Sequence, residues 1–313
     1  MAVQEPADLS AERLDCLIVG GGPAGLTAAI YLARFHLTVC VIDGGQSRAA
    51  LIPLTRNHAG FPEGVSGVDL LARMRRQAVL YGARLQDGIV DSLAHDGSQF
   101  IAQTGSRSLA ARTVLLATGV VNRRPTMMDD LCHDRALATG RLRYCPICDG
   151  YEVTDKAIAV LGTGERGYNE AMFLRGYSAD ITLVAPEGGH SLEPAQCAGL
   201  KAAGIGIAGQ CTSISLVEDQ IALGIESETR RFDTLYPALG SDIRSELAGM
   251  LGASRTSEGC LMVDAHQRTD IPGLYAAGDV VLGLDQISHA MGEGGVAATT
   301  IRNDLAKVAP IRR

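Results

Sequence analysis

Short apolar runs alternate along this chain with glycine-rich turns and helical stretches. The apolar run 16–19 is followed by the turn GGGPAG (20–25), a helical stretch over 26–34 and the β-branched run LTVCVID (37–43). The order strand, glycine turn, helix and strand is that of a dinucleotide-binding βαβ unit. We therefore predict one such unit at the start of the chain.

The same order recurs in the middle of the chain. The run KAIAVLG (156–162) leads into GTGERG (162–167), a helix to about Arg175 and the strand DITLVAP (180–186). Two such units predict an α/β protein with two Rossmann-like domains, the second inserted into the first. The apolar strand VLLATG (114–119) and the segment LYPALGS (235–241) mark the changes of domain. We place the first domain at 1–118 and 246–313, and the second at 119–245.

An amphipathic helix is predicted over 70–81. Its apolar positions fall on one face, and they are Leu71, Met74, Ala78 and Tyr81. Arg73 and Arg76 lie on the other face. We interpret them as a solvated basic face, and a docking patch for an acidic protein is the alternative.

Composition and charge exclude several classes of function. Tryptophan is absent, aromatic residues make up 4% of the chain and the net charge is −7. This balance does not suit a nucleic-acid-binding surface, so we expect no nucleic acid partner. Residues 1–15 lack the basic start and apolar run of a secretory signal, and no apolar stretch approaches the roughly 18 residues of a membrane span. We expect a soluble, cytoplasmic protein.

Only two of the eight cysteines are closely paired. Cys145 and Cys148 stand at CxxC spacing, directly before Asp149. This spacing lets a disulfide close locally and lets one thiol be activated by its surroundings. A zinc site would need two more ligands at comparable spacing, and the sequence offers no second CxxC and no paired histidines. We therefore predict a redox pair and no metal.

The first glycine turn has the pattern of a dinucleotide site. Gly20, Gly22 and Gly25 allow a tight turn, a close approach of backbone to a diphosphate, and close packing of helix on strand. The diphosphate would lie at the positive N-terminus of the following helix. Asp43 ends the next strand, where its carboxylate can accept hydrogen bonds from ribose hydroxyls.

The segment CPICDG (145–150) resembles the active site of the low-molecular-weight thioredoxin reductases. The order of glycine turn, CxxC-Asp-Gly, second glycine turn and Ala-Gly-Asp (277–279) matches that family over nearly the whole chain. The resemblance implies FAD, bound mainly by residues of the first domain. The implied FAD-binding residues are Gly20, Gly22, Pro23, Ala24, Gly25, Asp43, Gly44, Gly45, Gln46, Asn57, Ala117, Thr118, Gly119, Gly278, Asp279, Gln286 and Ile287.

The resemblance also implies roles for the CxxC site. Cys148 would lie against the flavin, Cys145 would attack the disulfide of a partner, and Asp149 would donate or shuttle the proton. The implied partner is a thioredoxin-like protein, and the implied assembly is a homodimer. The 119–245 domain would be NAD(P)-binding-like and would carry the CxxC pair.

This sequence departs from the family at the second glycine turn. NADPH-using members carry a basic cluster after the second strand to hold the 2′-phosphate, whereas this chain has VAPEGG (184–189). Ala185 stands where Asp43 stands in the first unit, and Glu187 would repel a phosphate. The pattern argues against NADPH and resembles the pyridine-nucleotide-independent branches, such as the ferredoxin-linked and deeply rooted thioredoxin reductases. Asp285 also stands where the family usually has a basic residue.

Three alternatives stay open at this point. A related dithiol oxidase would oxidise small dithiols with O₂, although such enzymes tend to have histidine, not aspartate, after the second cysteine. An NADPH-dependent thioredoxin reductase with an atypical cofactor site would still use a nicotinamide. A flavin-bearing sensor or binding module would show no turnover, but it would not need a proton donor beside its thiols.

Overall fold

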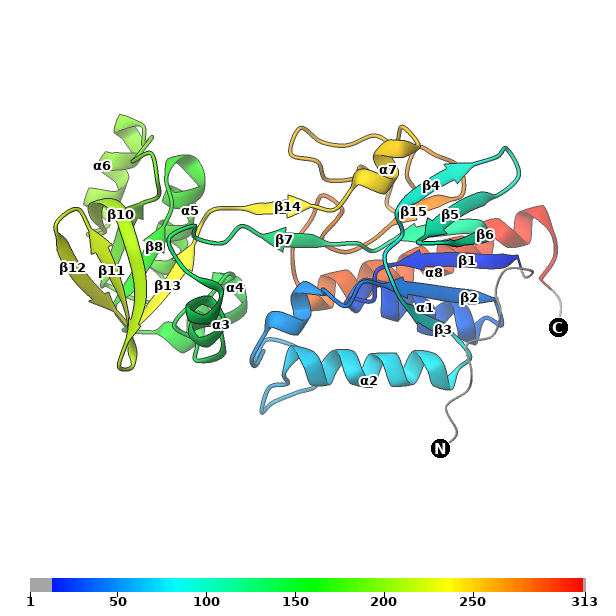
Figure 1. The fold of residues 1–313 in the computed structure, drawn as a ribbon, viewed down its shortest axis with the longest axis horizontal. Helices are drawn as coiled ribbons and strands as arrows, with labels where there is room; N and C mark the ends of the chain where they lie inside the picture. The colour runs from blue at the N-terminus through cyan, green and yellow to red at the C-terminus, as the bar shows by residue number, and fades with distance from the viewer. Residues whose placement is uncertain (1–12, 312–313) are drawn as a thin grey trace. The chain divides into compact units, whose positions relative to one another are not determined.

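The computed structural model describes residues 13–311, and it divides the chain into two compact units. Unit 1 consists of Met1–Ala50, Val68–Val121 and Ile243–Arg313, and unit 2 of Leu51–Gly67 and Asn122–Asp242. Both units are built on a sheet with helices (Figure 1), so the predicted α/β class is confirmed. The prediction that the chain starts without a secretory signal concerns residues 1–15. Of these, residues 1–12 lie outside the described residues.

The sheet of unit 1 joins parallel strands to an antiparallel meander. Its order is β3-β2-β1-β6-β5-β4, and β15 pairs with β6 as well. The strands are β1 (Leu14–Val19), β2 (Val39–Asp43), β3 (Arg84–Asp87), β4 (Ser92–His95), β5 (Phe100–Thr104), β6 (Arg107–Leu116) and β15 (Leu274–Ala276). β6 is long enough to pair with β5 at its start and with β1 and β15 at its end.

The parallel part of this sheet is buried on both faces, as its continuous apolar runs predict. Leu17 of β1 lies opposite Cys40 of β2 and Val114 of β6, and all three are fully buried. Parallel strands bring their carboxyl ends to one edge of a sheet. The residues that directly follow β1, β2, β6 and β15 therefore lie at the same edge, and these are the predicted cofactor-binding segments.

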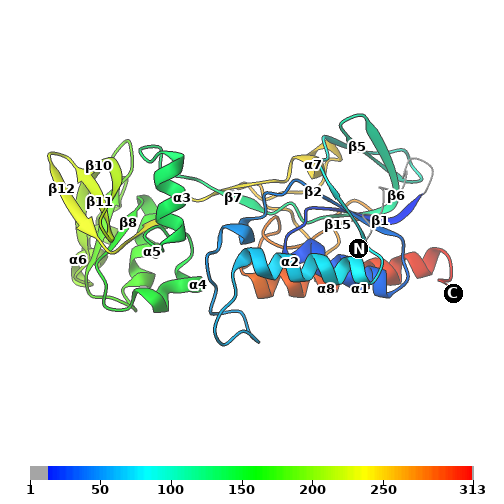
Figure 2. The same cartoon turned by 60° about the horizontal axis from the view of Figure 1, so that its bottom comes forward.

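Two helices cover one face of this sheet through small residues. α1 (Pro23–Arg34) and α8 (Ile287–Val308) pack side by side (Figures 1 and 2). The contact is close because a Cβ added at Gly294 would overlap the carbonyl oxygen of Ala24. The remaining helices of unit 1 are η1 (Arg48–Leu51), whose last residue already belongs to unit 2, α2 (Gly67–Leu80) and α7 (Glu246–Met250).

The predicted helix over 70–81 corresponds to α2. Leu71, Met74 and Ala78 are buried as expected, whereas Tyr81 lies beyond the helix end and is 40% exposed. The prediction for Tyr81 was wrong because its ring lies under the guanidinium of Arg34, at 4.5 Å from the ring centroid, and not in the core.

Unit 2 has a six-stranded sheet of order β12-β11-β10-β9-β8-β13. The strands are β8 (Ile158–Leu161), β9 (Ile181–Ala185), β10 (Gly206–Val217), β11 (Gln220–Ile225), β12 (Glu228–Phe232) and β13 (Thr234–Pro237). The helices are α3 (Asp130–Ala138), α4 (Pro146–Asp149), η2 (Gly150–Val153), α5 (Gly164–Leu174) and α6 (Pro194–Ala202). β8, β9 and β13 are parallel and buried along their whole length, and β10 to β12 form an antiparallel meander.

Two short strands carry the chain between the units. β7 (Val120–Asn122) pairs with β14 (Ser241–Ile243), and the change of unit falls within each of them. Among the helices of residues 13–311, none is long and apolar enough to cross a membrane.

Candidate active site

Cys145 and Cys148 form a disulfide at the start of the short helix α4 in unit 2. Pro146 supplies a fixed φ at the first helical position, and the Cα atoms of the two cysteines are 5.3 Å apart. The backbone N–H of Cys148 donates to the Sγ of Cys145 at 3.2 Å. Both cysteines are half-buried, and Ile147 between them is 48% exposed. The disulfide can therefore be reached from solvent while its backbone is held by the helix.

Asp149 is the last residue of α4, and its carboxylate accepts two side-chain hydrogen bonds. Arg143 Nη1 donates to Oδ2 at 2.8 Å, and the hydroxyl of Tyr236 donates to Oδ1 at 2.7 Å. Tyr236 lies on β13 and is fully buried. Burial raises the pKa of Asp149, although Arg143 and the Tyr236 hydrogen bond both act to lower it. The residue after Cys148 thus carries a carboxyl group whose pKa depends on its burial and on its hydrogen bonds with Arg143 and Tyr236.

A second carboxyl group lies near Asp149. Glu170 is on α5, which packs against α4, and its charge interacts with that of Asp149 and with Tyr236. Burial raises the pKa of Glu170 to about 7, while Arg166 on the same helix acts to lower it and Asp149 to raise it. Sequence reasoning missed Arg143, Tyr236 and Glu170. A tyrosine within the otherwise apolar strand TLYP was the one signal available.

The first glycine turn in unit 1 fits the diphosphate of a dinucleotide. A Cβ at Gly20 would overlap the carbonyl oxygen of Ala117, and one at Gly25 would overlap that of Gly20. Gly22 is the N-cap of α1, so no side chain caps the first turn, and Pro23 follows at the first helical position. The first-turn N–H groups and the helix dipole therefore suit a bound anion.

Asp43 lies beside this turn, as the ribose-binding prediction requires. It is buried, and a Cβ at Gly21 would overlap its carboxylate. Oδ1 accepts from the N–H of Gly45 at 3.0 Å, and Oδ2 forms an ion pair with Arg75 of α2 at 2.5 Å. Arg75 was not foreseen. It holds the carboxylate in place and takes up part of its hydrogen-bonding capacity.

The other predicted cofactor residues of unit 1 follow the strands at the same sheet edge. The backbone N–H of Ala117 donates to the carbonyl oxygen of Val19. The Thr118 hydroxyl donates to the carbonyl of Arg244 at 2.5 Å, and Gly119 has a positive φ. Gly44, Gly45 and Gln46 are exposed after β2, and Gln46 Oε1 accepts from Arg244 at 3.0 Å. Gln286 is the N-cap of α8, and Ile287 is its first residue.

Asp279 is held by a basic residue that sequence reasoning missed. Arg48 Nη1 lies 3.2 Å from Asp279 Oδ2 and 2.7 Å from Asp285 Oδ2. Asp285 stands where the family usually has a basic residue, and in the structure Arg48 supplies the positive charge beside it. Gly278 donates its N–H to Glu293 at 2.7 Å. Burial, and then Asp285, raise the pKa of Asp279, which Arg48 acts to lower.

Asn57 belongs to unit 2, whereas the other residues predicted to bind the flavin belong to unit 1. Its Oδ1 accepts from Thr55 at 2.8 Å, and its Nδ2 donates to the carbonyl of Ile147 at 3.3 Å. Arg56 also forms an ion pair with Glu152 at 3.6 Å. The segment 51–67 is therefore attached to the CxxC region, and Asn57 lies with the disulfide.

The second glycine turn keeps the packing of a nucleotide-binding fold but differs at its ends. An added Cβ at Gly167 would lie 2.7 Å from the carbonyl carbon of Gly162. Ser191 donates its N–H to Oγ1 of Thr163, the N-cap of α5, at 2.6 Å. The loop after β9 is thus tied to the N-terminal end of α5, and Glu165 places a negative charge in its first turn. β9 ends at buried Ala185, which has no group for a ribose.

The six remaining cysteines are free thiols. Cys16, Cys40, Cys211 and Cys260 are buried, while Cys132 and Cys197 are half-buried. Burial raises the pKa of Cys16 to about 12 and that of Cys40 to about 11, so both are unreactive core residues. Within residues 13–311 no group of three or more His, Cys, Asp or Glu side chains is placed to hold a metal ion.

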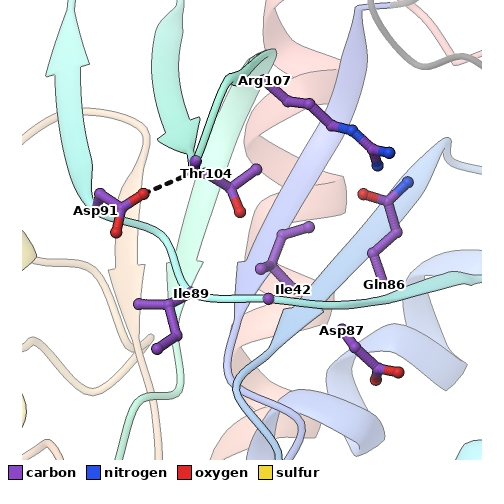
Figure 3. Close-up of a pocket in the computed structure, with 9 residues that line it drawn as sticks. Ile42, Gln86, Asp87, Ile89, Asp91, Thr104 and Arg107 are labelled. Carbon is purple, nitrogen blue, oxygen red and sulfur yellow. Dashed lines mark hydrogen bonds between the residues drawn. The ribbon is translucent and has the colours of Figure 1, made fainter.

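A shallow cavity of about 540 Å³ lies in unit 1, between the ends of β2 and β3 and the β5–β6 turn. Figure 3 shows Ile42 within it and the polar ends of Gln86 and Arg107 directed towards one another. Asp91 accepts from the N–H of Gly105 at 2.7 Å and fixes the turn. The cavity contains none of the cysteines.

Comparisons with known proteins agree with this arrangement. The pyridine nucleotide-disulphide oxidoreductase family model matches residues 14–294. A thioredoxin reductase from Mycolicibacterium smegmatis is 31% identical over 85% of this chain and 88% of its own. The crystal structure of thioredoxin reductase from Streptococcus pyogenes superposes with a TM-score of 0.87, at 25% identity over 96% of this chain and all of its own. An atypical thioredoxin reductase from Desulfovibrio vulgaris is 32% identical over 96% of this chain and all of its own, with a TM-score of 0.54.

The family match over residues 14–294 spans both units and the segment that contains the paired cysteines. The predicted resemblance to thioredoxin reductases is therefore confirmed at the level of the family. This chain belongs to the low-molecular-weight thioredoxin reductases within the pyridine nucleotide-disulphide oxidoreductase family, and it is an oxidoreductase that acts on a disulfide.

Proposed function

We propose that this enzyme reduces the disulfide of a thioredoxin-like protein through Cys145 and Cys148, and that its electrons come from a donor other than NADPH or NADH. The observation that carries the first part is the half-buried disulfide with the Asp149 carboxyl at the end of the same helix. The altered second glycine turn carries the second part.

FAD is the cofactor of this family, and unit 1 has the residues to hold it. The turn 20–25 would take the diphosphate, Asp43 the ribose, and the segments 44–46, 117–119 and 278–287 the flavin half. Unit 1 is in this proposal the FAD-binding domain, and unit 2 is the NAD(P)-binding-like domain. When bound, FAD stores two electrons and can deliver them to a disulfide.

The residues of unit 2 would carry out the exchange. Reduction of the disulfide takes up two electrons and two protons and leaves two thiols. As the resemblance implies, the Cys145 sulfur would attack the acceptor disulfide, and Cys148 would then displace the acceptor by closing the bond to Cys145. Asp149 would hold the proton that leaves the attacking thiol.

The identity of the donor is tested by anaerobic mixing. NADPH and NADH should leave the absorbance band of the oxidised flavin unchanged, whereas dithionite should bleach it. We infer that a one-electron protein of the ferredoxin type is the natural donor, as in the pyridine-nucleotide-independent branches. Rapid bleaching by either nucleotide would refute this part of the proposal and leave the disulfide chemistry standing.

The acceptor is tested with chemically reduced enzyme. Reduced wild-type protein should reduce a thioredoxin disulfide, and Cys145→Ser and Cys148→Ser should abolish this transfer. Cys132→Ser is the matched control, since Cys132 is a half-buried thiol of the same unit outside the disulfide. Gel filtration of the holoenzyme should show a homodimer. Oxidation of small dithiols by O₂ without any transfer to thioredoxin would favour a dithiol oxidase.

One observation favours NADPH as an alternative donor. The close packing of Gly162 and Gly167 is retained, so the backbone of the second turn still has the shape of a nucleotide site. The mixing experiment separates this alternative from the proposal.

A further inference from the structure

Asp149 lies within a set of charged and hydroxyl side chains contributed by four different segments. Arg143 precedes the CxxC pair, Tyr236 comes from β13, Glu170 from α5 and Glu152 from η2. Both oxygens of the carboxylate are engaged, one by Arg143 at 2.8 Å and one by Tyr236 at 2.7 Å. Such contacts to a half-buried carboxylate decide how readily it takes up a proton.

We propose that Arg143, Tyr236 and Glu170 are positioning residues that set when Asp149 binds and releases a proton during exchange at Cys145 and Cys148. Arg143 and Tyr236 stabilise the anion, because each donates a hydrogen bond to it. Glu170 opposes the anion, because it lies on α5, which packs against α4, and its charge interacts with that of Asp149. The proposal rests on the proposed function, in which Asp149 holds the proton of the attacking thiol.

The step that depends on the protonation of Asp149 is the two-electron exchange between the enzyme dithiol and the acceptor disulfide. At Cys145 an S–H bond breaks, its proton passes to Asp149, and the sulfur attacks the acceptor. The acceptor S–S bond breaks, a mixed disulfide forms, and the leaving acceptor sulfur takes the proton. Cys148 then loses its proton and closes the bond to Cys145, and the second acceptor sulfur is protonated. Two electrons and two protons have moved from the enzyme to the acceptor.

The two carboxyl groups should titrate as a coupled pair. The pKa of Glu170 is raised to about 7 by burial and by Asp149, and that of Asp149 is raised by burial and by Glu152. Arg166 acts to lower the pKa of Glu170, and Arg56 lies 3.6 Å from Glu152, so positive charges limit both effects. Protonation of one group should therefore favour ionisation of the other.

The inference predicts pH shifts of opposite sign. Exchange requires ionised Asp149, so its rate should rise with pH through the pKa of that group. Tyr236→Phe and Arg143→Met each remove a donor to the anion, and each should move the midpoint of this rise up by about one pH unit. Glu170→Gln removes the opposing charge at constant shape, and it should move the midpoint down.

The experiment measures the rate at which dithiothreitol-reduced holoenzyme, freed of reductant, reduces dithiobis(nitrobenzoate) across a pH series. Infrared titration of the protonated-carboxyl band provides a readout that needs no turnover, with Asp149→Asn identifying the band. Tyr177→Phe is the matched control, because the Tyr177 ring packs against Gly150 and its hydroxyl is not among the donors to Asp149. It should leave the midpoint in place.

The outcomes separate this inference from the proposed function. Midpoint shifts of opposite sign in Tyr236→Phe and Glu170→Gln support it, even if no thioredoxin is reduced, in which case the proposed function alone fails. Unchanged midpoints in both variants, or shifts in the same direction, would overturn it while leaving thioredoxin reduction intact.

Discussion

Replacing Arg48 by alanine tests whether unit 1 depends on a single cation beside Asp279. Arg48 contributes one nitrogen to both Asp279 and Asp285, at 3.2 and 2.7 Å. The side chains of Arg48 and Asp279 are only 22% and 20% exposed. The substitution therefore leaves a largely buried carboxylate beside a second carboxylate, with Glu293 also nearby.

The cost follows from burial and has a definite pH dependence. Loss of a hydrogen bond to a buried charged group costs about 2 kcal/mol, and the more exposed Asp285 adds little to this. Such a loss lowers the midpoint of thermal unfolding by roughly 4–8 °C in a unit of this size. The pKa of Asp279 is already raised by burial and would rise further without Arg48. A carboxyl with a raised pKa in the folded state loses stability as pH rises through that pKa, so the deficit should be larger at about pH 8 than at about pH 5.

The assay is thermal unfolding of the holoenzyme at both pH values, and release of the flavin is used to monitor unfolding. Arg231→Ala is the matched control, because its ion pair with Glu218 is 50% and 83% exposed and should contribute little. The double substitution of Arg48→Ala with Asp285→Asn should recover part of the loss. Equal midpoints for Arg48→Ala and Arg231→Ala, or a deficit that shrinks as pH rises, would refute this reasoning.

Two further predictions concern the packing of α8. Gly294→Ala should destabilise unit 1 by about 1–3 kcal/mol, because the new Cβ overlaps the Ala24 carbonyl. Gly292→Ala should not destabilise it, because a Cβ there would meet nothing within 4 Å. Urea unfolding of the two variants checks this prediction. Asp304→Asn should cost about 2 kcal/mol near neutral pH, because Asp304 accepts from Arg268 Nε at 2.7 Å and from the Tyr275 hydroxyl at 3.0 Å. The pKa of Asp304 is lowered by Arg268, so its contribution is present at neutral pH and lost in acid, and unfolding curves for wild type and variant should converge as pH falls below about 4.

Local patterns predicted the elements of this fold well because they report burial directly. The runs around β1, β2, β8 and β9 are continuous apolar strands in the structure, and both glycine turns lie between a strand and a helix as expected. The paired cysteines and Asp149 also stood out, since their spacing within one turn of helix brings them together whatever the rest of the chain does.

Contacts between distant segments could not be predicted from local patterns. The attachment of segment 51–67 to unit 2 depends on Asn57 and Ile147, which are far apart in the sequence. The hydroxyl of Tyr236 reaches Asp149 from a strand whose pattern indicates only a buried core. The pairing of Arg48 with Asp285 could have been suspected, because the loss of a basic residue at 285 calls for a positive charge from another segment.

The split of unit 1 between the two ends of the chain also has a consequence for synthesis on the ribosome. Apart from segment 51–67, unit 2 is made from one continuous stretch, whereas β15 and α8 of unit 1 come last. Because α1 packs against α8, unit 1 cannot complete its fold until α8 has been synthesised, whereas unit 2 can already fold. Capture of the cofactor should then be one of the final events of biogenesis, and translation arrested before residue 287 should yield a chain that binds no flavin and is therefore colourless.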